Sequence, residues 1–173
     1  SAEKITEACR LAGELSIECW IKISALTQNE PAKIVSLENE TATAFSLSCQ
    51  KDDRNPQKIN YFANLTTNTT DNRGNPDFNS KASTYPGILL HLVYTHSQNG
   101  EEMMYINGNA VSTGYRPPGY DKWESEYALV FANSLSGETP VLGNYYMCAI
   151  YNKALSSDEV QQNYYASPFA GNS

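Results

Sequence analysis

Residues 15–24, LSIECWIKIS, alternate strictly between apolar and other side chains, and this pattern restricts the fold more than any other part of the chain. The apolar set is Leu15, Ile17, Cys19, Ile21 and Ile23. The alternate set is Ser16, Glu18, Trp20, Lys22 and Ser24. Successive side chains of a β-strand point to opposite faces, so a period of two predicts a strand with one buried face.

Strand patterns recur along most of the chain. They cover residues 32–38, 44–49, 58–66, 88–96, 103–106, 127–133 and 145–151. The run 88–96 is apolar on both faces, as in a central strand. Asn99-Gly100 and Asn107-Gly108 suit tight hairpin turns. Short strands divided by such turns predict a sandwich or a barrel, with residues 66–86 and 114–126 as the longest irregular stretches.

The stretch 149–169, AIYNKALSSDEVQQNYYASPF, carries the signals of a strand followed by one short helix. Ser156 is a favourable N-cap, and Glu159 three residues later completes a capping box. Leu155 can pack against Val160, and Pro168 is expected to end the helix. A helix of about three turns is marginal alone, so this one is predicted to dock against the sandwich.

The size and charge of the chain exclude several classes of protein. We expect a single domain over residues 1–173, because this length allows one substantial core. The formal net charge of −7 repels phosphate backbones and argues against nucleic acid as a partner. No apolar run approaches the roughly 20 residues of a membrane helix, so membrane insertion is not expected. No signal peptide is recognised, and a start at Ser1 suits a mature protein or an excised domain.

The four cysteines, Cys9, Cys19, Cys49 and Cys148, match neither a zinc ribbon nor a C-x-x-C motif. Three of them fall in apolar alternations and are predicted to point inward. Two interpretations stay open: small buried thiols, or one disulfide if the protein is exported.

Five segments carry a family resemblance: GELSIECWIKI, AKIVSLE, LLHLVYT, MMYINGNAVSTG and LVFANSLSGETPVLGNYYMCAIYNKALSSDEVQQNY. In this order they resemble the laminin-G-like domains of the concanavalin A-like superfamily, especially the bacterial type. The resemblance implies an all-β jelly-roll sandwich of two antiparallel sheets with a short C-terminal helix. Such domains mostly bind glycans or extracellular proteins, sometimes with calcium, and some relatives are glycoside hydrolases. Fold alone does not choose among these.

Acid pairs give little support for hydrolysis. Glycosidases need two carboxylates roughly 5–9.5 Å apart. The superfamily's hydrolases often carry E-x-D-x-x-E on an inner strand, and this sequence has no such run. Glu38 and Glu40, and likewise Glu124 and Glu126, are spaced by two, but both pairs adjoin turn residues. We interpret them as solvated loop acids.

The two histidines give no catalytic pattern either. His91 and His96 are five residues apart on one predicted strand, so their side chains should point to opposite faces. His91 in LLHLVYT matches a histidine common in the corresponding strand of the family, and we interpret it as a structural hydrogen-bonding group. No G-x-S-x-G surrounds a serine. The chain is therefore not expected to be an enzyme.

A calcium site is a hypothesis for the segment TTDNRGNPDF. Asp71, Asn72, Asn75 and Asp77 supply the oxygen ligands that calcium prefers, although Arg73 and Pro76 interrupt the EF-hand order. The alternative is an Asx-rich turn that uses these side chains on its own backbone.

The loop GYRPPGYDKWESEY is the predicted glycan site. Tyr115, Tyr120 and Trp123 supply rings for sugar faces, while Arg116 and Asp121 supply donors and acceptors. The alternative is that Trp123 anchors the loop on the sandwich. A second, less focused aromatic set is Tyr61, Tyr85, Tyr145 and Tyr146.

The sequence thus favours a non-catalytic, extracytoplasmic recognition module for carbohydrate, calcium being the only cofactor considered. The expected location is secreted, periplasmic or on the cell surface, within a larger multidomain protein. The alternatives are a protein-interaction or adhesion domain without sugar affinity and a glycoside hydrolase.

Overall fold

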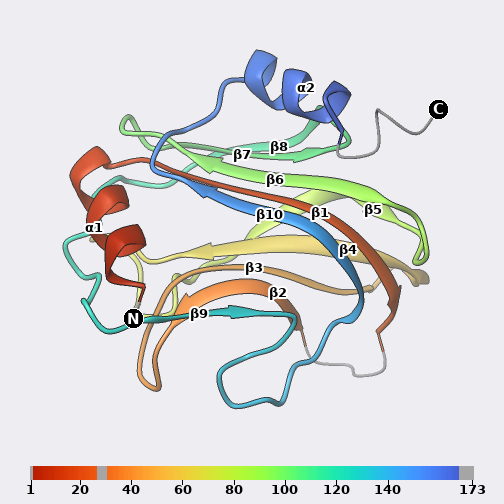
Figure 1. The fold of residues 1–173 in the computed structure, drawn as a ribbon, viewed down its shortest axis with the longest axis horizontal. Coiled ribbons are helices and arrows are strands. Elements are labelled where there is room, and N and C mark those ends of the chain that lie inside the picture. Colours follow the sequence, from red (N-terminus) through yellow and green to blue (C-terminus); the bar gives the residue numbers. More distant parts are fainter. Residues whose placement is uncertain (1, 27–30, 168–173) are drawn as a thin grey trace.

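The computed structural model describes residues 2–26 and 31–167 as two antiparallel five-stranded sheets and two helices (Figure 1). Sheet A contains, in spatial order, β10 (Leu142–Tyr151), β1 (Leu15–Ala25), β6 (Leu90–His96), β7 (Glu101–Ile106) and β8 (Asn109–Tyr115). Sheet B contains β5 (Phe78–Thr84), β4 (Asn55–Leu65), β3 (Thr43–Asp52), β2 (Ala32–Glu38) and β9 (Ala128–Phe131). The helices are α1 (Glu3–Ala12) and α2 (Ser157–Tyr165).

The core lies between the two sheets and follows the alternation in the sequence. The apolar set of β1, from Leu15 to Ile23, is at most 4% exposed. It belongs to one cluster with Phe45, Leu47 and Cys49 of β3, on the facing sheet. The central strand β6 is buried at every position, as its two apolar faces predict. The predicted sandwich of two antiparallel sheets is confirmed.

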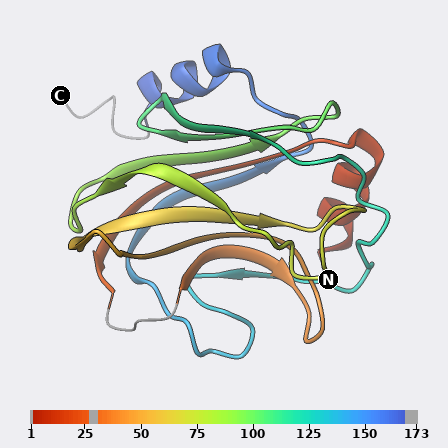
Figure 2. The same cartoon turned by 180° about the vertical axis from the view of Figure 1, so that it is seen from behind.

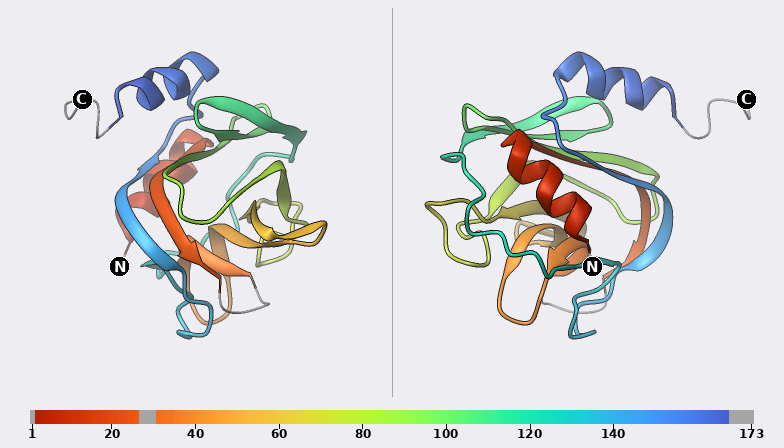
Figure 3. Two further views of the ribbon diagram at one scale, coloured as in Figure 1. Left: turned by 90° about the vertical axis from the view of Figure 1, so that its right-hand side faces the viewer. Right: turned by 60° about the vertical axis from the view of Figure 1, so that its left-hand side comes forward.

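Two elements depart from the sequence prediction. β5 lies within residues 66–86, which were predicted to be irregular, and pairs only with β4 (Figure 2). Its sequence, FNSKAST, is largely polar, because it is an edge strand with little apolar surface to bury. Helix α1 lies at one end of the sandwich (Figure 3) and buries Thr6 and Cys9. Its N-terminus has no side-chain cap, so the usual sequence signal is missing.

The C-terminal helix α2 lies on the outer face of sheet A, away from sheet B (Figures 1 and 3). The Ser156 side chain accepts from the Glu159 N–H and the Glu159 carboxylate accepts from the Ser156 N–H, so the predicted capping box is confirmed. Leu155 and Val160 share a buried cluster with two residues of sheet A, Val93 and Tyr105. The helix ends at Tyr165, whereas Pro168, its predicted terminator, lies outside the described residues.

Helix α2 also covers a buried polar group. Glu18 points away from the core, as the alternation predicts, yet it is only 1% exposed. One carboxylate oxygen lies 2.7 Å from Nε2 of His91. The other accepts from the hydroxyl of Tyr151, at 2.7 Å, and from the amide of Asn163 on α2, at 3.0 Å. The predicted structural role of His91 agrees with this geometry, and Glu18 links β1, β6, β10 and α2.

This network gives Glu18 a signature in the pH dependence of stability. Burial raises the pKa of Glu18, but its hydrogen bonds outweigh burial and hold the pKa below the ordinary 4.5. A carboxylate with a depressed folded-state pKa stabilises fully above its ordinary pKa and loses this contribution as the pH falls through the folded value. We expect Glu18→Gln to lower the free energy of unfolding by about 1.5–3 kcal/mol at neutral pH.

Urea denaturation of both proteins across the acid range checks this expectation. The gap between wild type and Glu18→Gln should narrow as the pH falls below 4.5. Glu101→Gln, which alters an exposed glutamate on β7, should leave stability within about 0.5 kcal/mol of wild type. If the stability difference between wild type and Glu18→Gln stayed constant from neutral to strongly acidic pH, the depressed pKa assigned to Glu18 would be contradicted.

The two outer faces of the sandwich therefore differ. Helix α2 covers part of the outer face of sheet A, over β1, β6 and β7, whereas neither helix of the described residues lies over the outer face of sheet B (Figures 1 and 3). Within residues 2–26 and 31–167, neither helix has the length and apolarity needed to cross a membrane.

Candidate ligand-binding site

The outer face of sheet B is polar, although the sheet itself is central to the fold. Every second residue of β3, from Phe45 to Cys49, belongs to the core. The alternate residues Ser46, Ser48 and Gln50 therefore point to the outer face. The alternation in residues 44–50 is enough to identify polar side chains at these positions. It does not reveal that Ser46 and Ser48 are only 3% and 2% exposed, although neither described helix lies over them (Figure 3).

Strands β4 and β2 continue this face. Asn64 and Phe62 of β4 lie opposite Ser46 and Ser48 in the register, and directly opposite residues share a face. On β2, Ser36 lies opposite Ser46, and Lys33 lies opposite Ser48. The outer face thus carries two rows of side chains, namely Ser36, Ser46 and Asn64, and Lys33, Ser48 and Phe62.

All of these residues except Ser36 line a hollow of about 300 Å³, here called the sheet B trough. Its lining residues are Pro31, Lys33, Ser46, Ser48, Gln50, Phe62, Asn64, Asn75 and Asp77. A second hollow of about 540 Å³ adjoins the trough, because Lys33 lines both. The other residues lining this second hollow are Glu38, Asn39, Glu40, Arg73, Ser134, Leu135, Ser136 and Glu138. Volumes of this size are typical of small-molecule sites.

Short polar side chains and one ring give the trough its chemistry. The hydroxyl of Ser46 and the amide of Asn64 are 3.4 Å apart, and Asn64 donates to Asn75 at 3.2 Å. The Ser36 hydroxyl is buried without a hydrogen-bond partner among the described residues. Ser36 is fully buried and lines neither hollow, so this hydroxyl adds no hydrogen-bonding capacity to the trough. Phe62 is the one aromatic residue among those that line the trough, and it is 7% exposed.

An ion pair separates the two hollows and corrects one expectation. Glu38, predicted to be a solvated loop acid, is 3% exposed and pairs with Lys33. Its other oxygen accepts from the Leu135 N–H at 2.7 Å. Glu38 is the last residue of β2, where the 132–141 loop covers it, and sequence spacing does not reveal this cover. Glu40, Glu124 and Glu126 are exposed, as predicted.

The loop at residues 66–77 forms one end of the trough, and it contains the predicted calcium ligands. Asp71 accepts from the N–H groups of Arg73 and Asn75 and from the Asn75 amide, each at 2.9 Å. Asp77 accepts from Asn79 at 2.6 Å. Burial raises the pKa of Asp71, but the bonds from Asn75, Arg73 and Gly74 together hold it below the ordinary value. These oxygens serve the loop's own backbone and amides, so the donor set does not fit a calcium cage.

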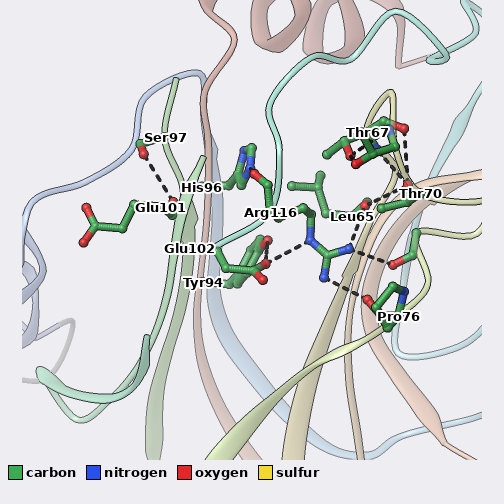
Figure 4. Close-up of polar contacts among 12 residues, drawn as sticks. Leu65, Thr67, Thr70, Pro76, Tyr94, His96, Ser97, Glu101, Glu102 and Arg116 are labelled. Atoms are coloured by element: carbon green, nitrogen blue, oxygen red, sulfur yellow. Dashed lines mark hydrogen bonds and ion pairs between the residues drawn. The ribbon is translucent and has the colours of Figure 1, made fainter. Parts of the chain in front are cut away.

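A buried guanidinium holds this loop in place (Figure 4). Arg116 is 5% exposed, and its Nε donates to Glu102 of β7 at 2.9 Å. Its remaining nitrogens donate to the carbonyl oxygens of Leu65, Gly74 and Pro76, at 3.4, 3.2 and 2.8 Å. Arg116 was predicted to contact a glycan. The structure instead makes it a positioning residue, because all its donor groups point into the molecule.

A second set of contacts joins residues 116–123 to the same loop. Asn68 donates to the carboxylate of Asp121 at 2.7 Å and accepts from the Asp121 N–H at 3.1 Å. Lys122 donates to the Thr70 carbonyl oxygen at 2.5 Å. Gly119 has φ of +105°, and a Cβ there would lie 2.5 Å from the Asn68 amide. The two stretches that the sequence singled out separately, for calcium and for glycan, thus brace each other.

The two rings central to the predicted glycan site are core residues. Tyr120 and Trp123 are 3% and 2% exposed, and their stacked rings lie 4.6 Å apart. The indole N–H of Trp123 donates to the Thr66 carbonyl oxygen at 2.8 Å. This is the anchoring role considered as the alternative for Trp123. Neither ring presents a face on which a sugar could stack.

His96 locks the same loop from the inner face of sheet A, opposite to His91 as predicted. Its Nε2 lies 3.0 Å from the Arg116 carbonyl oxygen, which can only accept, so Nε2 carries the proton. Nδ1 then accepts from the Tyr120 hydroxyl at 2.6 Å. Burial lowers the pKa of His96 and raises that of Tyr120, in agreement with neutral partners.

Only Tyr115 and Asp121 of the predicted ligand set are exposed, and Asp121 already binds Asn68. The second aromatic set is dispersed. Tyr61 is buried, Tyr145 is partly buried and donates to the Ile34 carbonyl oxygen, and Tyr85 and Tyr146 are exposed. No common aromatic surface joins these four residues.

Comparison with known proteins relates this geometry to a family. A family model described as the concanavalin A-like lectin/glucanases superfamily, of the laminin G type, matches residues 3–161. No curated protein sequence matches the chain.

Three solved structures illustrate the structural likeness. A heptameric SAP-like pentraxin of Limulus polyphemus has a TM-score of 0.63 at 15% identity, over 89% of this chain and 70% of that one. A candidate carbohydrate-binding protein of Bacteroides ovatus has a TM-score of 0.62 at 12% identity, over 87% of this chain and 40% of that one. The third is domain 4 of AbnA, a GH43 extracellular arabinanase of Geobacillus stearothermophilus, in complex with arabinotriose. It has a TM-score of 0.58 at 19% identity, over 87% of this chain and 66% of that one. These likenesses show a shared fold.

Proposed function

This chain belongs to the concanavalin A-like lectin/glucanases superfamily, and we propose that it is a non-catalytic carbohydrate-recognition module whose ligand lies in the sheet B trough. The observation that carries the proposal is the contrast between the two outer faces. Helix α2 lies on the outer face of sheet A, whereas neither described helix lies over the outer face of sheet B (Figure 3). There the trough has the buried hydroxyls of Ser46 and Ser48 at its floor and the less buried amides of Gln50, Asn64 and Asn75 around them.

The trough has the chemistry that a sugar requires. A pyranose or furanose ring presents many hydroxyl groups, each able to donate and accept. Serine hydroxyls and the amides of Gln50, Asn64 and Asn75 can do the same, and they stand on rigid strands or on a braced loop. Phe62 is only 7% exposed, so these polar groups, and not stacking on its ring, would hold a sugar in the trough. The ordering cost of binding is therefore small.

The buried acids support recognition over hydrolysis. Glu18 is paired with His91, Glu38 with Lys33, and Glu102 with Arg116. Each of these carboxylates already serves a structural partner. A retaining or inverting glycosidase needs one carboxyl group free to transfer a proton and a second facing the same bond.

Two neighbours make the choice of ligand concrete. The arabinanase domain binds arabinotriose, and the Bacteroides ovatus protein is a candidate for carbohydrate binding. The chain spans 66% and 40% of these two chains, so the activities of the whole proteins remain proposals for this one. We propose that the module acts outside the cytoplasm, attached to a larger protein.

Binding of arabinotriose and of a panel of soluble polysaccharides, measured by calorimetry and affinity electrophoresis, tests this proposal. Gln50→Ala and Asn64→Ala should each weaken binding about 3- to 10-fold, the amount expected for one lost hydrogen bond. Gln161→Ala, which alters an exposed glutamine on α2, is the matched control and should leave affinity unchanged.

Three results would contradict the proposal. If Tyr115→Ala weakened binding while both trough variants bound normally, the ligand would lie at the 114–126 loop. If no carbohydrate in the panel bound, a protein-interaction or adhesion role would replace carbohydrate recognition. Release of reducing sugar from any polysaccharide would favour the hydrolase alternative.

A further inference from the structure

Two of the four cysteines meet on neighbouring strands. Cys19 of β1 lies directly opposite Cys148 of β10 in the antiparallel register. Their sulfur atoms are 3.2 Å apart. All four cysteines are free thiols in the structure, and Cys9 and Cys49 have no comparable thiol neighbour among the described contacts.

The two sulfur atoms of this pair are in contact, and one of them can be reached from solvent. A disulfide requires sulfur atoms about 2.05 Å apart, so closing the gap needs roughly 1 Å of movement. Cys19 is fully buried, but Cys148 lies on the edge strand of sheet A and is partly exposed. Cys148 lines a hollow of about 300 Å³ together with Phe131, Tyr145, Tyr146 and Met147. A small reagent can therefore reach one sulfur of the pair.

We propose that Cys19 and Cys148 are an oxidation site, which small-molecule disulfides convert into a cross-strand disulfide. The Cys148 thiolate attacks one sulfur of the oxidant and releases a thiolate, which leaves a mixed disulfide on Cys148. Cys19 then loses its proton and attacks the Cys148 sulfur, and the second thiolate leaves. Two protein thiols and one disulfide become one protein disulfide and two small thiols, so protons and electrons balance.

The local environment sets the order and pace of these steps. The hydrogen bond with Cys148 and burial raise the pKa of Cys19 well above its ordinary value. Attack must therefore begin at the accessible sulfur, and closure should accelerate as the pH rises, because the thiolate is the nucleophile. Burial raises the pKa of Cys9 to about 11 and that of Cys49 to about 12, so these thiols should stay unreactive.

The consequence for the fold would be large. The two cysteines are 129 positions apart, so the bond would join the first strand of the chain to the last. Closing such a long loop restricts the unfolded chain strongly. It would also fasten the edge strand β10, which leads directly into α2. The proposal does not depend on carbohydrate binding.

Incubation of the reduced protein with oxidised glutathione, followed by intact mass and peptide mapping, tests the proposal. We expect loss of two hydrogen atoms, a cross-linked peptide pair containing Cys19 and Cys148, and a rise in Tm on the order of 10 °C that a reductant reverses. Cys9→Ser and Cys49→Ser should behave in the same way. Cys148→Ser should form no disulfide.

Three outcomes would overturn the proposal. The first is a stable glutathione adduct on Cys148 that never resolves. The second is a bond involving Cys9 or Cys49. The third is a folded wild-type protein in which Cys148 reacts with iodoacetamide yet no disulfide forms after prolonged oxidation at alkaline pH. Peptide mapping of the wild type distinguishes these outcomes even if a serine variant fails to fold.

Discussion

Replacing Arg116 with alanine should lower the free energy of unfolding by about 3–5 kcal/mol, because it leaves the buried carboxylate of Glu102 without its partner. The substitution also removes the donors that hold the carbonyl oxygens of Leu65, Gly74 and Pro76. Those three groups fix the ends of the 66–77 loop. We therefore expect the loop to loosen in any molecules that still fold, and the trough to lose its end wall of Asn75 and Asp77.

Guanidinium chloride denaturation gives the stability change, and hydrogen exchange of residues 65–77 reports the loosening of the loop. Arg54→Ala is the matched control, because the Arg54 side chain is 85% exposed and faces Asp52 at 3.9 Å. It should change stability by less than about 0.5 kcal/mol. If Arg116→Ala lowered stability no more than this control, the ion pair and hydrogen bonds of Arg116 would not be required for the fold.

Replacing Trp123 with alanine should cost about 3–5 kcal/mol, the range for large aromatic side chains removed from a core. The indole packs against Tyr120 and Phe45, with ring centroids at 4.6 and 6.1 Å. Its loss also leaves the Thr66 carbonyl oxygen without the N–H that it accepts from. A cavity and an unpaired acceptor would therefore arise together, at the point where the two braced loops meet.

Thermal unfolding distinguishes this result from a binding role. Tyr115→Ala removes an exposed ring of the same loop and should leave Tm nearly unchanged. If Trp123→Ala kept wild-type stability and lost carbohydrate binding, the indole would be a ligand platform and not a core residue.

The most reliable predictions from sequence were those in which neighbouring residues carry the signal. The alternation in residues 15–24 reproduced the inward set of β1 position by position. The capping box of α2 was predicted because its donors and acceptors lie within four residues of one another. Helix α1 lacked such a cap, and β5 lacked apolar alternation, so both were missed.

The predicted binding loop shows why other residues could not be placed in this way. A stretch with three rings and several charges is equally compatible with a sugar site and with a loop anchored in the core. The choice depends on Thr66, Leu65 and Gly74, which lie more than 40 positions away in the sequence. Glu18 and Glu38 are similar cases, because α2 and the 132–141 loop bury side chains that their own strands leave outward.

The order of the residues was thus enough to predict most of the strands, the hairpin turns, the final helix and the inward faces of strands such as β1 and β3. These features depend on backbone geometry and on a period of two, which act over a few residues. Which outward faces stay open was decided by tertiary packing. Helix α2 docks on sheet A, and neither described helix lies over the outer face of sheet B (Figures 1 and 3). The two long loops became a brace because their hydrogen bonds form only once the sheets have brought them together.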